Sequence, residues 1–279
     1  MNALAAPSFL SRMQRVAAHG AVAVKRLDDA NRLARLYQEG AAKIRLPSCD
    51  AGPLEAVLIN TAGGLTGGDR IAWAIEAAEG ASMTVTTQAC EKVYRSAGGE
   101  ARSACSIVVG RNARIAWLPQ ETIVYDASAF SRTLDVELAD CATALIMEAT
   151  VFGRRAMGES VDQASFRDRW RVRVSGRLVH GEDFAIGPQV QSTLERKAVT
   201  GGGNAIATLL LVGPDAADRL PAVRDVIGDA GGASAWSVGG TGKLLARLVA
   251  ADGYSLRQRL VPLVGLLNGQ AGLPKIWSL

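Results

Sequence analysis

Acidic and amide side chains recur at the ends of alternating segments in the middle of this 279-residue sequence. Gln88 and Gln120 each stand seven residues after an alanine, and Glu148 stands six residues after another. Two more carboxylates, Glu91 and Glu121, follow the two glutamines closely. Spaced oxygen ligands hold a divalent transition metal less firmly than a cluster of imidazoles or thiolates does. If the segments stack, these side chains would come close together and could line an interior polar passage. The alternative is that they close the strand ends by hydrogen-bonding turn amides.

The glycine-rich segment NTAGGLTGGD at residues 60–69 is the second place where the sequence could do chemistry. It does not fit a P-loop, which needs lysine and then serine or threonine where this chain has Asp69 and Arg70. It does not fit a dinucleotide fingerprint either, because a strand pattern and not a helix pattern follows it. A tight turn, with glycines supplying positive φ angles, explains the glycines and leaves the role of Asp69 open.

Residues for nucleophilic or metal catalysis are scarce. Only two histidines occur, His19 and His180, so a histidine-rich metal centre cannot form and a Ser-His-Asp triad would have to use one of them. No serine stands in a G-x-S-x-G motif. The cysteines form no C-x-x-C pair, because 41, 15 and 36 positions separate Cys49, Cys90, Cys105 and Cys141. We expect no catalytic residues, no tightly bound cofactor and a reducing compartment.

Composition narrows the class of protein further. With 48% hydrophobic and 21% charged residues, the chain can bury a sizeable core and should be globular. A net charge of +4 is too even a balance to predict nucleic-acid binding. The longest uncharged run, residues 198–214, is too short to span a bilayer, and Arg12 and Arg15 interrupt the only region where a leader peptide could form. We therefore expect a cytoplasmic protein that binds neither nucleic acid nor membranes.

Three segments share one layout of strand, polar turn, alanine and strand, at residues 73–88, 106–120 and 136–149. Their alanines, Ala81, Ala113 and Ala142, lie 32 and 29 residues apart. Strand repeats near this length are typical of solenoids, in which each unit buries its face against the next. An antiparallel meander gives the same alternation, so the pattern alone leaves both arrangements open.

Residues 166–186 predict a hairpin that turns at Ser175 and Gly176. A period of two places Asp168 on the apolar side of the first strand. The opposite side carries a row of arginines that predicts a solvated face, with an acidic partner as the alternative: Arg167, Arg169, Arg171 and Arg173.

The pattern changes after residue 204. Residues 205–270 predict the order β-α-β-β-α, which would add a smaller helix-bearing layer to a mostly β body. We expect Ser255 to cap the last helix, Gly269 to end it, and Pro221 and Pro262 to kink or shorten their helices.

Several segments resemble, in order and spacing, the urease accessory protein UreD family, called UreH in some species. These are LINTAGGLTGGDR, VTTQACEKVYRS, WLPQETIVYDAS, MGE, RDRWRV, GRLVHGE, ATLLLVG and LPKIW. The resemblance runs from about residue 20 to the C-terminus. Cys90 stands where the family pattern has alanine, which adds a possible soft ligand. The motif positions carried over are Asn60, Gly63, Gly64, Gly67, Gly68, Asp69, Gln88, Tyr94, Arg95, Gln120, Glu159 and Arg169.

The resemblance implies a right-handed β-helix-like stack of strands and a single domain over residues 1–279. The β body would cover about residues 20–200 and the helix-bearing layer about 205–279. The resemblance also implies a non-enzymatic chaperone that binds apo-urease, recruits UreF and the GTPase UreG, and helps nickel reach the urease active site. A water-filled tunnel is the nickel route proposed in this family.

Our hypothesis is that nickel in transit meets a row of oxygen groups along such a path, with Gln88 and Gln120 as neutral neighbours. The candidate groups are Asp69, Glu91, Glu121, Glu148 and Asp168. The alternative is an enzyme that binds a nucleotide or another phosphorylated ligand at the glycine-rich loop.

Overall fold

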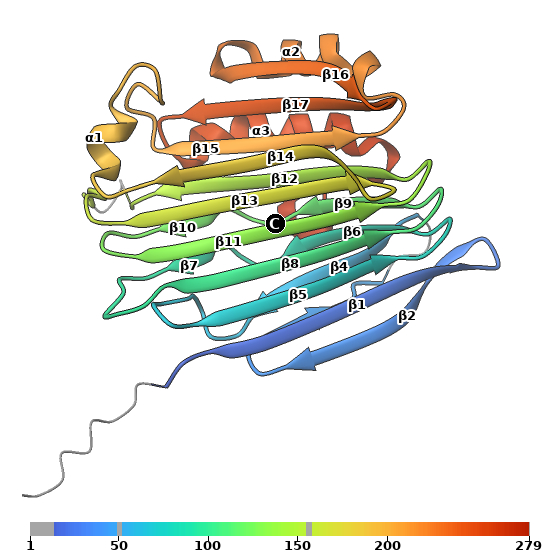
Figure 1. The fold of residues 1–279 in the computed structure, drawn as a ribbon, viewed down its shortest axis with the longest axis horizontal. Helices are drawn as coiled ribbons and strands as arrows, with labels where there is room; N and C mark the ends of the chain where they lie inside the picture. The colour runs from blue at the N-terminus through green and yellow to red at the C-terminus, as the bar shows by residue number, and fades with distance from the viewer. Residues whose placement is uncertain (1–13, 49–51, 155–157, 279) are drawn as a thin grey trace, which may run out of the picture.

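Two β-sheets packed face to face form the body of the protein (Figure 1). The computed structural model describes residues 14–48, 52–154 and 158–278. The predicted domain limits of 1 and 279, Cys49 and the methionine of the MGE motif lie outside these residues. Sheet A has seven strands, in the order β14 (Arg177–Ile186), β13 (Ser165–Val174), β11 (Ala129–Leu138), β8 (Ala101–Val109), β5 (Arg70–Ala77), β1 (Ala17–Leu27) and β2 (Ala30–Glu39).

Sheet B has ten strands. Eight of them run in the order β16 (Gly231–Val238), β17 (Thr241–Ala250), β15 (Ala205–Val212), β12 (Thr143–Phe152), β9 (Arg114–Leu118), β6 (Ser82–Thr87), β4 (Leu54–Asn60) and β3 (Ala42–Arg45). The other two are short, β7 (Glu91–Val93) and β10 (Thr122–Val124), and β10 pairs with both β7 and the far end of β12.

The chain alternates between the two sheets as it climbs the stack. Within sheet A, β1, β5, β8, β11 and β13 pair in parallel, and within sheet B, β4, β6, β9 and β12 do so. Each coil therefore places one strand in each sheet and the next coil stacks on it. This pairing confirms the predicted β-helix-like stack and decides against the antiparallel meander.

The repeated alanines lie at equivalent corners of successive coils. Ala81, Ala113 and Ala142 are all buried, and each precedes a strand of sheet B whose first residues are paired in register. A side chain larger than a methyl group would separate the coils at these corners, which explains why the repeat has alanine there.

The molecule has three layers because sheet B is covered on both faces. Its inner face packs against sheet A, where Ile115 and Trp117 join one apolar core, while Ala116 and Leu118 join a second core beneath the helices. The alternation of side chains along one strand thus serves two cores at once. The strands β9, β12 and β15 accordingly read as nearly continuous apolar sequence.

The predicted β-α-β-β-α order of the C-terminal layer is also confirmed. It comprises β15, α2 (Leu220–Ile227), β16, β17 and α3 (Gly253–Asn268), and α2 and α3 pack on each other and on sheet B. A short helix, α1 (Val190–Leu194), lies before this layer. Pro221 stands in the first turn of α2, where its missing N–H costs no hydrogen bond, so the helix is shortened as predicted. Pro262 does not shorten α3, which continues to Asn268.

One cap differs from the prediction. Asp252, not Ser255, is the N-cap of α3, and its carboxylate accepts a hydrogen bond from the backbone amide of Ser255 over 2.8 Å. Gly269 does end this helix, with a φ of 60°. Aspartate and serine are equally good caps, so the sequence alone did not separate two candidates three residues apart.

The predicted hairpin joins β13 to β14 with both turn residues at positive φ, 48° at Ser175 and 77° at Gly176. The period of two also holds on β13, because Phe166, Asp168 and Trp170 are buried while the arginines between them face outward. A carboxylate is thus carried into the interior between the two sheets, and its partner there defines the candidate site.

Candidate functional site

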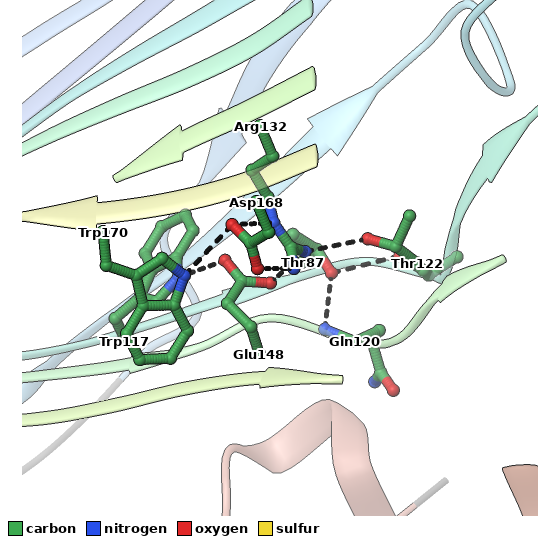
Figure 2. Close-up of polar contacts among 9 residues, drawn as sticks. Thr87, Trp117, Gln120, Thr122, Arg132, Glu148, Asp168 and Trp170 are labelled. Carbon is green, nitrogen blue, oxygen red and sulfur yellow. Dashed lines mark hydrogen bonds and ion pairs between the residues drawn. The ribbon is translucent and has the colours of Figure 1, made fainter. Parts of the chain in front are cut away.

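A buried arginine joins two of the predicted carboxylates. Arg132 on β11 and Asp168 on β13 are neighbours in sheet A, whereas Glu148 comes from β12 in sheet B. The guanidinium donates to Asp168 through Nε, 3.1 Å from Oδ1, and through Nη2, 2.5 Å from Oδ2. Its Nη1 donates to Glu148 Oε2 (Figure 2). All three side chains are less than a tenth exposed, so this triad links the two sheets through the interior.

Neutral donors complete the environment of the two carboxylates. The Trp117 indole donates to Glu148 Oε1 over 2.9 Å, and the Trp170 indole donates to Asp168 Oδ1 over 3.1 Å (Figure 2). Arg132 Nη1 also donates to Thr122 Oγ1 over 3.1 Å, and the guanidinium carbon lies 5.6 Å from the centre of the Phe166 ring. Every carboxylate oxygen of the triad therefore has an N–H donor.

Burial and charge act in opposite directions on the triad. Burial raises the pKa of Glu148 well above its ordinary value, although Arg132 works against that rise. Burial disfavours the charged form of Arg132, but the two carboxylates outweigh it and the pKa of the guanidinium is raised. Arg132 is thus a permanent cation, and the charge of the triad changes only through its carboxylates.

A cavity of about 160 Å³ adjoins the triad. It lies between the upper strands of the two sheets and is lined by Arg132, Glu148 and Asp168 together with Glu182 and Arg247. Glu182 is largely buried and forms an ion pair with the half-exposed Arg247, 2.7 Å from Nη2 to Oε1. The cavity thus runs from the buried triad toward a charged pair that reaches solvent.

Gln120 and Glu121 form a second polar cluster, on the helix side of sheet B. The sheet is interrupted here, because β9 ends at Leu118 and β10 begins at Thr122. Arg257 of α3 donates to Gln120 Oε1 over 2.8 Å and to Glu121 Oε2 over 3.1 Å. Since the adjacent Thr122 contacts Arg132, the interruption places the two clusters on opposite sides of sheet B.

Cys90 belongs to the second cluster as a protonated thiol. Its Sγ lies 3.4 Å from Glu121 Oε2 and donates to it. Burial, followed by the charge of Glu121, raises the pKa of the Cys90 thiol to about 11. Because metals bind the thiolate, Cys90 is a poor metal ligand in this state.

Glu91 begins β7, the short strand that pairs with β10. Both of its carboxylate oxygens accept from the Asn60 side-chain amide, over 3.0 and 3.2 Å, and its backbone amide donates to the carbonyl of Glu121. Burial raises the pKa of Glu91 to about 7, although the Asn60 hydrogen bond acts to lower it. Gln88 stands just before this strand, where its backbone amide donates to the carbonyl of Leu58.

Asp69 lies apart from these clusters, within the glycine-rich loop. Its Oδ1 accepts from the backbone amide of Val16 and its Oδ2 from that of Thr66, each over 2.8 Å. The loop therefore carries its own anion, which engages the Thr66 amide, while the amides of Gly63, Leu65 and Gly68 donate to backbone carbonyls. The glycines allow close packing: a Cβ on Gly67 would lie 2.0 Å from Ser96 Oγ, and Gly63, Gly64 and Gly68 have positive φ angles.

Three other motif residues, Tyr94, Arg95 and Glu159, lie near this loop. Tyr94 donates to the carbonyl of Gly63 over 3.3 Å and packs edge-on against Tyr125. Glu159 accepts from Arg154 Nε over 2.8 Å, and a shallow surface pocket here is lined by residues that include Tyr94, Arg95 and Glu159. Arg169 lies elsewhere, on the outer face of sheet A, 3.6 Å from Asp135.

The structure thus brings together Glu148 with Asp168, and Gln120 with Glu121. The arginines that hold these pairs, Arg132 and Arg257, were not predicted. Arg132 was detectable, since it stands among Phe130, Leu134 and Val136 on the apolar side of an alternating strand. Arg257 gave no such signal, because arginine on a surface helix is ordinary.

Two broader features hold over the part of the chain that the structure describes. No group of three or more His, Cys, Asp and Glu side chains there is placed to hold a metal ion. Nor does any helix in that part combine the length and the apolar character needed to cross a membrane.

Comparison with known proteins now assigns the family. Residues 16–278 match the family described as UreD urease accessory protein. The chain is 63% identical over 266 residues to the urease accessory protein UreD of Mesorhizobium japonicum, which covers 95% of both chains. It is 55% identical over 267 residues to that of Brucella suis, covering 96% of both, and 54% identical over 269 residues to urease accessory protein UreD 1 of Brucella anthropi, covering 95% of both. The chain therefore belongs to the UreD family of urease accessory proteins.

Proposed function

We propose that this protein is a non-catalytic scaffold for urease maturation that binds apo-urease and links it to UreF and the GTPase UreG. Its relatives carry the name urease accessory protein. That name says only that they assist urease, so the partners belong to the proposal. No tightly bound cofactor is required, because nickel is cargo.

We further propose that nickel passes through the interior of the β-stack. The observation that supports this most strongly is the placement of Glu148 and Asp168, two buried carboxylates that line the cavity between the two sheets. A single guanidinium faces the two carboxylates, so when both are ionised one negative charge stays uncompensated beside an open volume. Their oxygens are hard ligands that stand as a pair, which suits weak and reversible binding of a divalent cation.

The route would continue through the interruption of sheet B. From the triad it would pass Thr122 to Gln120 and Glu121 and then reach Glu91 at the start of β7. Successive acidic groups lower the energy of a cation along such a path, and the arginines that hold them keep the carboxylates apart. Asp69 would stabilise the glycine-rich loop near the start of the stack.

Co-expression tests the scaffold role. The full chain is produced with apo-urease subunits, UreF and UreG, and an affinity tag on this chain is used to isolate complexes. The proposal expects apo-urease and UreF to co-purify with it, and urease made without this chain to contain little nickel. Full nickel loading without this chain would overturn the proposal.

A further inference from the structure

Arg132 donates hydrogen bonds to one oxygen of each carboxylate, and a metal ion bridging the pair would have to bind these two oxygens. Glu148 Oε2 and Asp168 Oδ2 accept hydrogen bonds from Arg132 alone among the described residues. The remaining oxygens, Glu148 Oε1 and Asp168 Oδ1, each accept from an indole N–H. The indoles belong to Trp117 and Trp170, two large rings packed in the core. Among the described residues, Arg132 is thus the one donor whose departure would free an oxygen on both carboxylates.

The cavity gives Arg132 somewhere to go. The cavity of about 160 Å³ adjoins the guanidinium. At about 30 Å³ per water molecule it has room for about five waters, more than the four heavy atoms of a guanidinium group need. Glu182, which pairs with the half-exposed Arg247 at the other side of the cavity, would share its carboxylate with the displaced cation. A flexible arginine stem allows this movement without moving β11.

Charge balance makes the exchange feasible. With both carboxylates ionised, the triad carries one uncompensated negative charge, because a single guanidinium faces two carboxylates. A divalent cation would neutralise both carboxylates, and the displaced guanidinium would remain near Glu182. The interior would therefore gain a cation without leaving a carboxylate unpaired, which is the costly outcome in a buried site.

We propose that Arg132 is a tethered counter-cation that a passing divalent cation must displace from Glu148 and Asp168, and that returns when the cation leaves. This inference rests on the proposed nickel passage and adds a gate to it. When no nickel is bound, Arg132 stays hydrogen-bonded to both carboxylates. By competing for their oxygens it lowers the affinity of the pair for nickel, so that the cation is released. The residue acts on the cargo through the carboxylates and is not itself a ligand.

Nickel binding by Arg132→Met in the full-length chain tests the gate. Removing one positive charge from between two carboxylates should tighten nickel binding by about ten-fold or more, measured by calorimetric titration with Ni²⁺. The double variant R132M/E148Q restores the parent charge of the triad and should lose that gain. Arg114→Gln is the matched control, because Arg114 is a half-buried arginine that hydrogen-bonds to Asn268 and not to a carboxylate. Unchanged nickel affinity in a cooperatively folded R132M protein would overturn the gate.

R132M leaves two buried carboxylates without their cation and this variant can fail to fold, so the parent chain supplies a second measurement. With ¹⁵N-labelled arginine, the Arg132 Nε–H signal should be protected from solvent exchange in the metal-free protein. Saturating Zn²⁺, a diamagnetic substitute for nickel, should remove that protection. An Arg132 signal that Zn²⁺ leaves unchanged overturns the gate.

The gate and the passage fail in different ways. E148Q/D168N can lower nickel loading of urease while R132M keeps the parent nickel affinity and Zn²⁺ leaves the Arg132 Nε–H signal unchanged. In that case the passage stands and the gate is wrong. If E148Q/D168N loads urease normally, the passage itself is wrong, whatever Arg132 does.

Discussion

Asp69 accepts a hydrogen bond from the backbone amide of Val16, 53 residues earlier in the chain, over 2.8 Å. Its second oxygen closes the glycine-rich loop on the amide of Thr66. This carboxylate therefore fastens the start of β1 to the loop before β5, two strands that then pair in parallel. The contact indicates a role in holding the first coil together.

Asp69→Asn should lower the free energy of unfolding by about 2 kcal/mol, because the amide group replaces one charged acceptor with a donor that faces a backbone N–H. Nickel loading of urease by the folded variant should equal that of the parent. Urea denaturation and metal analysis of co-expressed urease provide the two measurements. Glu79→Gln, at an exposed carboxylate, is the control. Normal stability of D69N would contradict the assigned role.

Gly64 tests how the loop packs on the next coil. A Cβ there would lie 2.4 Å from the Tyr94 ring and 2.6 Å from the carbonyl oxygen of Lys92, at a φ of +146°. Gly64→Ala should cost about 2 to 4 kcal/mol from strain and overlap together. Gly63→Ala is the matched control, since its Cβ would meet open space and only the φ of +76° adds strain, about 1 kcal/mol. Equal denaturation midpoints for the two variants would rule out this packing.

Glu91 should make the protein less stable as the pH rises from about 4.5 to about 7. Its folded-state pKa of about 7 exceeds the ordinary value of 4.5, so between these values the folded chain keeps a proton that the unfolded chain releases. Stability is then lost on going up through this window. Glu91→Gln remains neutral and should remove about 2 to 3 kcal/mol of the change. Denaturation curves across this range measure it, with the exposed Glu76→Gln as control; parallel pH profiles of parent and E91Q would refute the assignment.

His180 should act in the opposite direction. Its side chain is buried, Nε2 has no hydrogen-bond partner among the residues that the structure describes, and burial, followed by the charges of Lys243 and Arg247, lowers its pKa from 6.5 to about 4. Between these two pH values the unfolded chain therefore binds a proton at this histidine and the folded chain does not. Stability falls as the pH is lowered through this range. His180→Gln should reduce this acid destabilisation by about 2 kcal/mol. His19→Gln, on β1, should not; equal effects of the two changes would show that burial of His180 is not the cause.

Much of the fold could be predicted from the sequence, but the direction of strand pairing could not. Alternation with a period of two is the same in parallel and antiparallel sheets, so the alanines at 81, 113 and 142 indicated a repeat without deciding how its strands pair. Register also misled the comparison of strand ends. Ile146 pairs with Trp117, so Glu148 lies level with Pro119 and not with Gln120. A shift of one residue sends a side chain to the other face, which is why Glu148 faces the interior while Gln120 faces α3.

The candidate site was less predictable than the fold. Asp168 was identified as a carboxylate on an apolar face, and the same reasoning applied to Arg132 would have found its partner. The meeting of Asp168 with Glu148 depends on two sheets packing face to face, and no local pattern encodes that distance. Asp69 and Glu148 looked alike in the sequence, as acids near strand ends, but backbone amides hold the first and a buried guanidinium holds the second.

Nickel content per urease active site is the measurement that tests the interior passage most directly. Urease is co-expressed with its accessory proteins and either the parent chain or the isosteric variant E148Q/D168N, and Glu55→Gln serves as a control at a buried carboxylate outside the passage. Complex formation is verified for each variant by co-purification. We predict that E148Q/D168N forms the complex but delivers several-fold less nickel, while E55Q delivers the parent amount. Parent-level nickel with E148Q/D168N would contradict the account.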